Sequence, residues 1–264
     1  MSDATFIVLD ATAGGEMLRA CIDSIGAQSI APQEIILFDN GSPQPIQMNG
    51  VRVIRSETNI GFAAGVNAAL EQSTAPYLAV INNDVVLDRD WLAVTRQVLD
   101  IDEKAGAVQT IIRRDERTID GGGIDISDGT FRQAGHGMPI GTALPHAWGV
   151  SATATLYRRS AIGARMFEPR FFAYYEDVEL SARLHQEGWR TVVAPVVKAT
   201  HRGSASAPLL GRRAVYLRTR NRYFVARMHR GAGRISALLV EDVKLLMRGK
   251  SSMRGVIEGL CSRL

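Results

Sequence analysis

Short apolar segments alternate with helical segments through the first 81 residues of the chain. Four of these segments are rich in β-branched or aromatic residues and too short for helices, which predicts buried strands at Phe6–Leu9, Ile35–Phe38, Val51–Ile54 and Tyr77–Ile81. Apolar residues at helical spacing lie between them, at Met17–Ile25 and Phe62–Leu70. This order of elements predicts an α/β fold with a mainly parallel central sheet and helices on both faces.

The next 120 residues show a weaker pattern. It predicts a helix that Asp88 or Asp90 caps and that runs to Leu99, a strand at Val108–Ile112, a helix at Asp177–Gly188 and a strand at Thr191–Ala194. Pro195 should end the last of these strands, because proline cannot donate to a sheet ladder. Glycine-rich residues 115–149 predict hairpins or a mobile loop layer and no second core.

Acidic and basic residues are divided unevenly along the chain. Residues 1–197 hold 16 Lys and Arg against 24 Asp and Glu, whereas residues 198–264 hold 15 against 3. A hydrophobic fraction of 46% excludes disorder and allows a substantial core. We therefore expect an acidic body and a basic C-terminal part with different roles.

Targeting signals and membrane-spanning segments are not recognisable in the sequence. Cys21 and Cys261 lie near opposite ends, and the first residues lack the apolar stretch of a secretory signal. No segment approaches the ~20 apolar residues that a membrane-spanning helix needs. The expectation is a protein of the reducing cytoplasm that does not cross a membrane.

Polar residues follow three of the predicted strands, at the positions where open α/β sheets bind ligands. They are Asp39-Asn40-Gly41-Ser42, Asn59-Ile60-Gly61-Phe62 and Asn82-Asn83-Asp84. Asp39 is suited to accept hydrogen bonds from a base or a ribose, and Gly61 to let a phosphate approach the backbone. Asp84 and the two amides before it offer the hard oxygen ligands that Mg²⁺ or Mn²⁺ prefers. Each motif taken alone is also ordinary turn chemistry.

Three carboxylates gather in Glu176-Asp177-Val178-Glu179, in the first turn of a predicted helix. The helix dipole favours negative charge there, which explains the cluster without any function. The aromatic segment Phe171–Tyr175 before it would partly desolvate a carboxylate, as suits a general base. His201 offers an imidazole to the same metal or to a phosphate, although a lone histidine more often does neither.

In this order, the motifs closely resemble glycosyltransferase family 2, and in particular its bacterial rhamnosyltransferase-like branch. The resemblance covers about residues 5–230 and rests on Asp39–Ser42, Asn59–Asn67, Asn82–Val85, Phe171–Leu180 and His201. It implies a GT-A fold, a Rossmann-like α/β domain that binds a nucleotide-sugar on its N-terminal half and the acceptor on its C-terminal half.

The resemblance also implies roles for individual residues. Asp39 would contact a pyrimidine base, and the nucleotide-sugar pocket would include Asn59, Gly61, Phe62, Asn67, Asn82, Asn83 and Asp84. Asp84 would hold Mg²⁺ or Mn²⁺, with His201 completing the metal or diphosphate site. Asp177, next to Glu176, would be the catalytic base.

The acceptor side is less well marked. Trp148 and Tyr174 are candidate acceptor contacts, although a buried core position is at least as consistent with Trp148. Two departures from the family pattern concern the donor side. Residues 10–15 replace a Thr-Tyr-Asn-like loop, and Asn82 replaces the first acid of an Asp-x-Asp motif.

The implied function is inverting transfer of a sugar from a pyrimidine nucleotide-sugar, either dTDP-rhamnose-like or a UDP-sugar. The acceptor would be a hydroxyl group of a glycan or lipid-linked molecule in cell-surface polysaccharide synthesis. The alternative is a catalytically weak nucleotide-sugar or glycan-binding protein on the same fold. A nucleotidyltransferase is less favoured, because no glycine-rich phosphate loop with Arg and Lys lies near the N-terminus.

The basic C-terminal part has two apolar stripes at helical spacing, at 211–230 and 235–247. We expect a GT-A domain at 1–205 and a basic amphipathic helical extension at 206–264. The extension would pack on the body, form a homodimer, or sit on an anionic membrane surface, which would make the protein peripheral on the inner face of the cytoplasmic membrane. Nucleic acid is not expected, because the arginines alternate with core-type residues.

Overall fold

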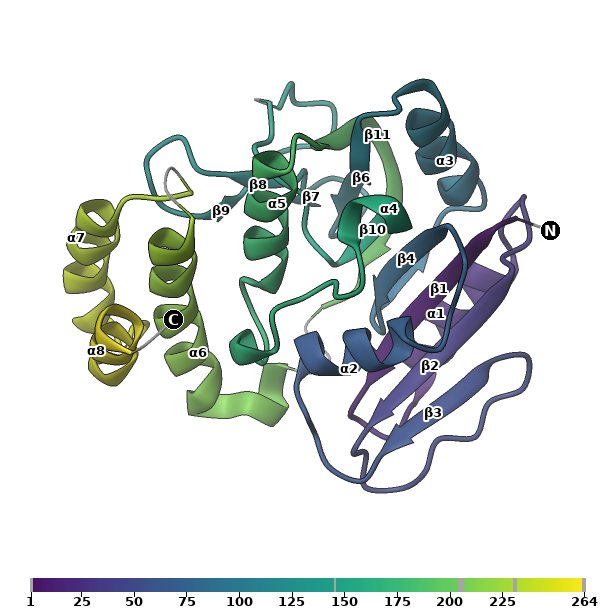
Figure 1. Ribbon diagram of the computed structural model, residues 1–264, viewed down its shortest axis with the longest axis horizontal. Coiled ribbons are helices and arrows are strands. Elements are labelled where there is room, and N and C mark those ends of the chain that lie inside the picture. Colours follow the sequence, from purple (N-terminus) through teal and green to yellow (C-terminus); the bar gives the residue numbers. More distant parts are fainter. Residues whose placement is uncertain (1, 145, 204–206, 230–231, 263–264) are drawn as a thin grey trace.

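The computed structural model describes residues 2–144, 146–203, 207–229 and 232–262. Its centre is a nine-stranded sheet with the strand order β3-β2-β1-β4-β10-β6-β11-β5, and β7 pairs with β6. Helices cover both faces of this sheet, and the three C-terminal helices form a layer to one side (Figure 1). The predicted α/β fold with helices on both faces is therefore confirmed.

The sheet strands and the helices differ widely in length. The strands are β1 Ala4–Asp10, β2 Glu34–Asn40, β3 Arg52–Ser56, β4 Tyr77–Asn82, β5 Val85–Leu87, β6 Ala105–Arg113, β7 Ile119–Gly121, β8 Ile124–Asp125, β9 Arg132–Gln133, β10 Ala154–Arg158 and β11 Arg190–His201. The helices are α1 Glu16–Gly26, α2 Phe62–Leu70, α3 Trp91–Ile101, α4 Arg159–Ile162, the 3₁₀ helix η1 Pro169–Phe171, α5 Glu176–Gln186, α6 Ala207–Met228, α7 Ile235–Leu246 and α8 Met253–Cys261.

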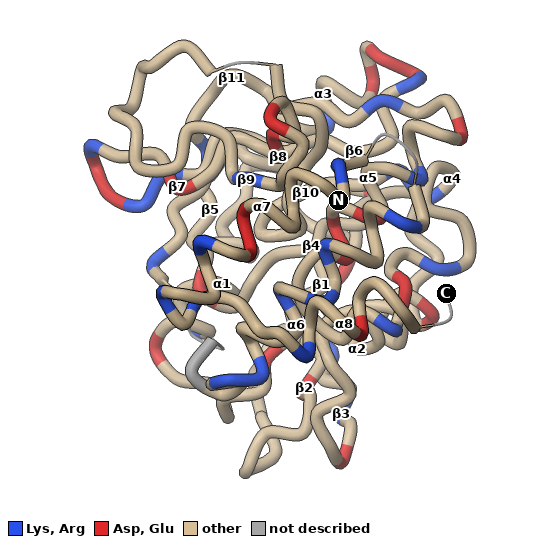
Figure 2. The backbone as a smooth tube through the Cα atoms, turned by 90° about the vertical axis from the view of Figure 1, so that its left-hand side faces the viewer, with Lys and Arg blue, Asp and Glu red and all other residues tan. Residues whose placement is uncertain are grey.

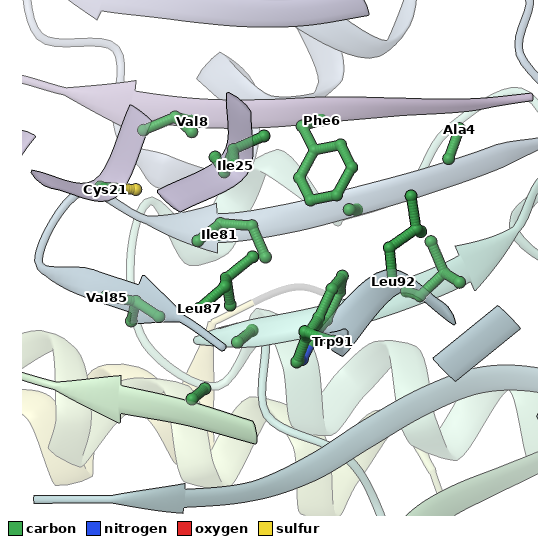
Figure 3. Close-up of a cluster of buried hydrophobic side chains, with 14 of the residues drawn as sticks. Ala4, Phe6, Val8, Cys21, Ile25, Ile81, Val85, Leu87, Trp91 and Leu92 are labelled. Carbon is green, nitrogen blue, oxygen red and sulfur yellow. The ribbon is translucent and has the colours of Figure 1, made fainter. Parts of the chain in front are cut away.

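The four predicted N-terminal strands are confirmed as β1 to β4, and they pair in parallel. Neighbouring residues of β1 face opposite sides of the sheet. Phe6 packs on the side of α1 and α3, where its ring centroid lies 5.9 Å from that of Trp91 (Figure 3). Ile7 packs with α2 on the other side. The carboxyl ends of these strands therefore share one edge of the sheet, where polar loops can meet.

The second half of the sheet is mixed. β10 is antiparallel to both of its neighbours, β4 and β6, and its first residue, Ala154, pairs with Ile81 near the end of β4. The backbone N–H of Asn82 donates to the Thr153 carbonyl at 2.9 Å. Residues just before β10 thus lie beside the carboxyl end of β4.

The prediction that Pro195 ends a strand is wrong. β11 continues past it to His201, with register shifts against β6 on either side of Val197. The irregular pairing lets proline, which has no N–H to donate, stay inside the strand. The second part of β11 pairs with β5, so that His201 lies opposite Val85, next to Asp84.

The two helix-end predictions have different outcomes. Asp90 precedes α3, but its side chain makes no cap hydrogen bond and instead forms an ion pair with Lys198 at 2.7 Å. Capping by an Asp side chain is therefore wrong for Asp90. Gly188 follows the last turn of α5 with a φ of 83°, a conformation that glycine adopts without steric cost. Residues 115–149 contain β7 and the β8–β9 hairpin, as expected of a hairpin region.

The C-terminal helices pack against α5 and against one another. α6 is kinked at Gly211, and its Phe224 packs edge-to-face on Phe171 with ring centroids 6.1 Å apart. α8 approaches α6 closely through two glycines, since a Cβ at Gly255 or Gly259 would lie under 3.0 Å from α6 backbone atoms. The predicted boundary at 205/206 lies outside the described residues. Within the described part of the chain, no helix is long and apolar enough to cross a membrane.

We predict that Gly106→Ala lowers the free energy of unfolding by about 1–3 kcal/mol. A Cβ on this β6 glycine would lie 2.9 Å from the Ala161 Cβ and 3.1 Å from the Trp189 Cβ, and neither atom can rotate away. The matched control is Gly26→Ala at the end of α1, where nothing lies within 4 Å and stability should be unchanged or slightly higher. Urea denaturation of both variants checks this, and equal stabilities would contradict it.

Candidate active site

A cavity of about 1000 Å³ opens at the carboxyl edge of the parallel strands. The segment 171–177 and α6 form its opposite wall. Ten of the residues predicted from the sequence line it: Asn59, Gly61, Phe62, Asn82, Asn83, Asp84, Tyr174, Glu176, Asp177 and His201. The structure therefore brings together side chains that are far apart in the sequence.

Asn40 organises the loop before α2. Its Nδ2 donates to the Asn59 Oδ1 and to the Gly61 carbonyl, both at 3.2 Å, and its Oδ1 accepts from the Ile60 N–H at 2.9 Å. Gly61 has a φ of 90°, and a Cβ there would lie 2.6 Å from the Phe172 carbonyl oxygen. Only glycine therefore fits where this loop meets the segment 171–177.

Asp39 lies outside the described lining of the cavity. Its buried carboxylate accepts from the Ser42 and Ile46 N–H groups at 3.0 and 3.1 Å and forms an ion pair with Arg55. Although burial opposes the charged form, these hydrogen bonds hold the pKa of Asp39 below its usual value. In this arrangement the side chain stabilises the turn after β2.

Two further candidates do not line the cavity in its described part. Asn67 ties α2 to the segment before η1, because its Oδ1 accepts from the Met166 and Phe167 N–H groups and its Nδ2 donates to the Phe167 carbonyl. Trp148 packs edge-to-face on His185, with ring centroids 5.1 Å apart. The geometry of both side chains is that of packing and of hydrogen bonds within the fold.

Asp10 holds the loop that departs from the family pattern. Its buried carboxylate accepts from the backbone N–H groups of Thr12 and Gly14 at 2.8 and 3.0 Å, and from Asn83 Nδ2. The first loop is therefore tied to the turn that carries Asp84.

His201 bridges two carboxylates. Its Nε2 lies 3.2 Å from Asp84 Oδ1, and its Nδ1 lies 2.7 Å from Asp120 Oδ2. Although burial favours the neutral imidazole, the carboxylates of Asp120 and Asp84 raise the pKa of His201 to about 9. Carboxylate oxygens are ligands that Mg²⁺ or Mn²⁺ prefers, whereas the His201 imidazole would have to lose its proton before it could bind a metal. The described residues hold no cluster of three or more His, Cys, Asp or Glu around one metal position, so a bound ion would need oxygen ligands from elsewhere.

Glu176 and Asp177 form an acidic pair at the start of α5, with Glu176 buried and Asp177 half-buried. Asp177 accepts from the Val178 N–H at 2.8 Å and the Ala152 N–H at 3.2 Å, whereas the buried Oε2 of Glu176 has no partner among the described residues. Burial and the Asp177 charge raise the pKa of Glu176 to about 8, and burial raises that of Asp177. The hydrogen bonds place the negative charge on Asp177 and the proton on Glu176.

The segment before this pair has an unusual backbone. Phe172, Tyr174 and Tyr175 have backbone φ values of 63°, 71° and 71°, which residues other than glycine rarely adopt. Asn221 of α6 holds this segment, because its Nδ2 donates to the carbonyls of Phe171, Ala173 and Tyr174 at 2.7–2.9 Å. A strained turn thus positions the carboxylates.

Comparison with known proteins identifies the family. Residues 7–165, more than half of the chain, match the glycosyl transferase family 2. The chain belongs to this family.

Relatives agree with the assignment to this glycosyltransferase family. The N-acetylglucosaminyl-diphospho-decaprenol L-rhamnosyltransferase of Mycobacterium tuberculosis is 26% identical over 76% of each chain. The O-antigen biosynthesis protein RfbC of Myxococcus xanthus is 29% identical over 72% of this chain and 16% of its own.

The GT-A fold is confirmed by two solved glycosyltransferase structures. The mannosyltransferase PcManGT of Pyrobaculum calidifontis, solved with GDP-Man and Mn²⁺, superposes with a TM-score of 0.58 at 15% identity, covering 99% of this chain and 76% of its own. S. aureus TarS gives a TM-score of 0.54 at 14% identity, covering 83% and 40%.

Sequence reasoning missed several residues of this glycosyltransferase's cavity and its support. Asn40 was noted only as part of a turn, and Asp120, which faces His201, lies in the glycine-rich stretch with no motif around it. The chain order gives no signal that Asn221 supports residues 171–174. These contacts are set by the mixed sheet and by α6.

We predict that Glu176→Gln stabilises the protein by about 1–3 kcal/mol at pH 8 and by less at pH 5. The ordinary pKa of Glu176 is 4.5, and its pKa in the folded protein is about 8. Between these two pH values, Glu176 is ionised in the unfolded chain and protonated in the folded chain. The free energy of unfolding therefore falls as the pH rises through this window in the wild type, and glutamine removes that loss.

Urea denaturation at the two pH values checks this prediction. The control is Glu187→Gln, which removes an exposed charge at the other end of the same helix. A stability difference between wild type and Glu176→Gln that stays constant from pH 5 to pH 8 would show that Glu176 titrates normally.

Proposed function

We propose that this glycosyltransferase moves a sugar from a pyrimidine nucleotide-sugar to a hydroxyl group of a glycan or lipid-linked acceptor, inverting the anomeric carbon. The observation that carries the proposal is the half-buried carboxylate of Asp177 in the same cavity as Asp84 and His201. A deoxyhexose or hexose in cell-surface polysaccharide synthesis is supported by the M. tuberculosis relative, a rhamnosyltransferase by name, and by the O-antigen protein of M. xanthus.

Asp177 would act as the general base. The acceptor oxygen attacks the anomeric carbon from the face opposite the nucleoside diphosphate, and the acceptor proton moves to an Asp177 carboxylate oxygen. The bond between that carbon and the diphosphate oxygen breaks, with its electron pair leaving on the phosphate. A base whose pKa is raised by burial accepts a proton more readily than an exposed aspartate does.

Asp84 and His201 would hold the divalent cation. When bound, Mg²⁺ or Mn²⁺ neutralises the charge that develops on the leaving diphosphate. Because Asn82 gives an amide where the family has a first carboxylate, the chain contributes less negative charge to the cation. We therefore expect the ion to bind weakly until the donor diphosphate supplies further oxygen ligands. Mn²⁺ is named with GDP-Man in the PcManGT structure.

We also propose that the outward face of α7 and α8 contacts an anionic membrane surface. Val240, Val243 and Met247 are 61%, 63% and 80% exposed, and Met253 and Ile257 continue the apolar face on α8. The acidic side chains of these two helices form ion pairs with arginines.

The ion pairs leave the outward charge positive. Glu241 and Asp242 pair with Arg222, and Glu258 pairs with Arg220 at 3.5 Å. Both arginines belong to α6, whose arginines are drawn in blue in Figure 2. Lys244, Arg248 and Lys250 have no carboxylate within 4.0 Å in the described part of the chain. An apolar face bordered by unpaired cations fits anionic lipid better than a second copy of the same positive surface.

Nucleotide binding and turnover test the proposed transfer. Pyrimidine nucleotide-sugars should raise the melting temperature only with Mg²⁺ or Mn²⁺ present. Asp177→Asn should keep donor binding but lower kcat by about 10²–10⁴-fold, because the acceptor proton loses its base. Glu187→Gln, which removes an exposed charge just after the same helix, should turn over like the wild type.

Three outcomes would count against the transfer proposal. If no pyrimidine nucleotide-sugar binds in the presence of metal, the donor class is wrong. If the donor binds and Asp177→Asn is as active as the wild type, the base is a different residue. Donor binding without any turnover would favour the alternative, a nucleotide-sugar-binding protein on the same fold.

Vesicle sedimentation tests the membrane surface. The wild type should partition to phosphatidylglycerol vesicles more than to phosphatidylcholine vesicles, and less at high salt. Val240→Glu combined with Val243→Glu should abolish the difference. Ile101→Glu, at a 78% exposed apolar residue on α3, is the control and should behave like the wild type. Equal partitioning of the wild type to both lipids at low salt would overturn the proposal.

A further inference from the structure

Four arginines line the cavity, and two of them are already paired. The Nη2 atom of Arg114 lies 2.9 Å from His136 Nε2 and 3.6 Å from Asp120 Oδ1. Arg132 forms ion pairs with Asp128 and Glu241. Arg202 and Arg218 have no carboxylate within 4.0 Å in the described part of the chain. These two cations are available to an anion that enters the cavity.

The two available arginines lie on different walls of the cavity. Arg202 follows His201, and its backbone N–H donates to the Asp84 carbonyl at 2.9 Å, so it belongs to the donor side. Arg218 comes from α6, and its guanidinium carbon lies 4.3 Å from the ring centroid of Tyr174, three residues before Asp177. An anionic group bound to Arg218 would therefore belong to the acceptor, the molecule whose hydroxyl group reaches Asp177.

The aromatic contact prepares Arg218 for an anion. Stacking on Tyr174 restricts the side chain without using the N–H donors that bind a phosphate. Planar guanidinium groups donate pairs of parallel hydrogen bonds to phosphate oxygens. Because the group is exposed, it gains this interaction without first breaking an ion pair.

The same wall carries apolar residues. Leu209 and Leu210 of α6 line the cavity ahead of the kink at Gly211, and Leu209 is 54% exposed. A leucine so exposed in the same cavity as an available cation suits a ligand that is both anionic and apolar. A neutral glycan would use neither feature.

We propose that the α6 wall is an acceptor subsite for a phosphate-bearing lipid, with Arg218 binding the phosphate and Leu209 and Leu210 contacting the apolar chain. The inference rests on the proposed glycosyl transfer and narrows its acceptor to a lipid phosphate or diphosphate. α6 thereby supplies part of the substrate site in addition to supporting residues 171–174.

Binding of farnesyl diphosphate to the full chain tests this subsite. The titration is done with a saturating pyrimidine nucleoside diphosphate and Mg²⁺, so that the donor site cannot take the probe. Arg218→Gln should weaken farnesyl diphosphate binding by about tenfold or more, which is the loss expected for a charge-assisted hydrogen bond, and Arg218→Lys should recover part of it. Leu209→Ser should weaken binding of farnesyl diphosphate but not of inorganic pyrophosphate.

Arg212→Gln is the matched control, since this α6 arginine is exposed and lies outside the described cavity lining. It should bind the probe like the wild type. Circular dichroism should show that all variants stay folded, as expected for exposed side chains.

Three results would overturn the subsite. The first is equal affinity of the wild type and Arg218→Gln for farnesyl diphosphate. The second is equal affinity of the wild type for inorganic pyrophosphate and for farnesyl diphosphate, which would show that the apolar chain makes no contact that contributes to binding. The third is an Arg218→Gln defect confined to phosphatidylglycerol vesicles, which would make Arg218 a membrane contact.

The nucleoside diphosphate provides the separate check on the proposed function. If it fails to bind with Mg²⁺, the transfer proposal fails whatever the probe does. If it binds and farnesyl diphosphate does not, only the acceptor subsite fails.

Discussion

The hydrogen bonds of Asn221 hold the segment on which the candidate active site depends. Three residues with positive φ between Phe171 and Glu176 each cost on the order of 1–3 kcal/mol of backbone strain. One fully buried amide group offsets part of this strain by donating to three carbonyls of the segment. The result is a turn that places Tyr174, Glu176 and Asp177 in the wall of the cavity. The helix that carries Asn221 is thus a component of the active site.

The mixed sheet completes the arrangement. β10 inserts antiparallel next to β4 and brings Ala152, whose N–H binds Asp177, to the carboxyl edge of the parallel strands. β11 keeps its pairing past Pro195 and delivers His201 to Asp84. The proposed metal side and base side of the cavity are consequently placed by two neighbouring regions of one sheet, with little freedom to move apart.

Features that depend on local patterns are predicted well by the sequence. The strands β1 to β4 and the helices α1 and α2 follow from the sequence, because short apolar runs and helical spacing depend only on nearby residues. The passage of β11 through Pro195 does not follow from the sequence, because it depends on the register with β6 and β5.

The same distinction explains which residues of the candidate site could be predicted. Asn59, Gly61, Asp84 and Asp177 are found from motifs, whereas the inward turn of Asp39 towards Arg55 and the pairing of Asp120 with His201 depend on distant partners. The roles proposed for these residues stay predictions.

The position of Asn221 in the chain has a consequence for biosynthesis. A ribosome makes the sheet and residues 171–177 before α6 exists, so the strained turn has no amide to hold it while these residues emerge. The parallel strands can pair during synthesis, but the acidic pair takes its final position only after residue 221 has been added and α6 has docked. The enzyme is therefore expected to mature in two steps, with the sheet first and the cavity last. Nascent chains would hold folded strands without a competent site.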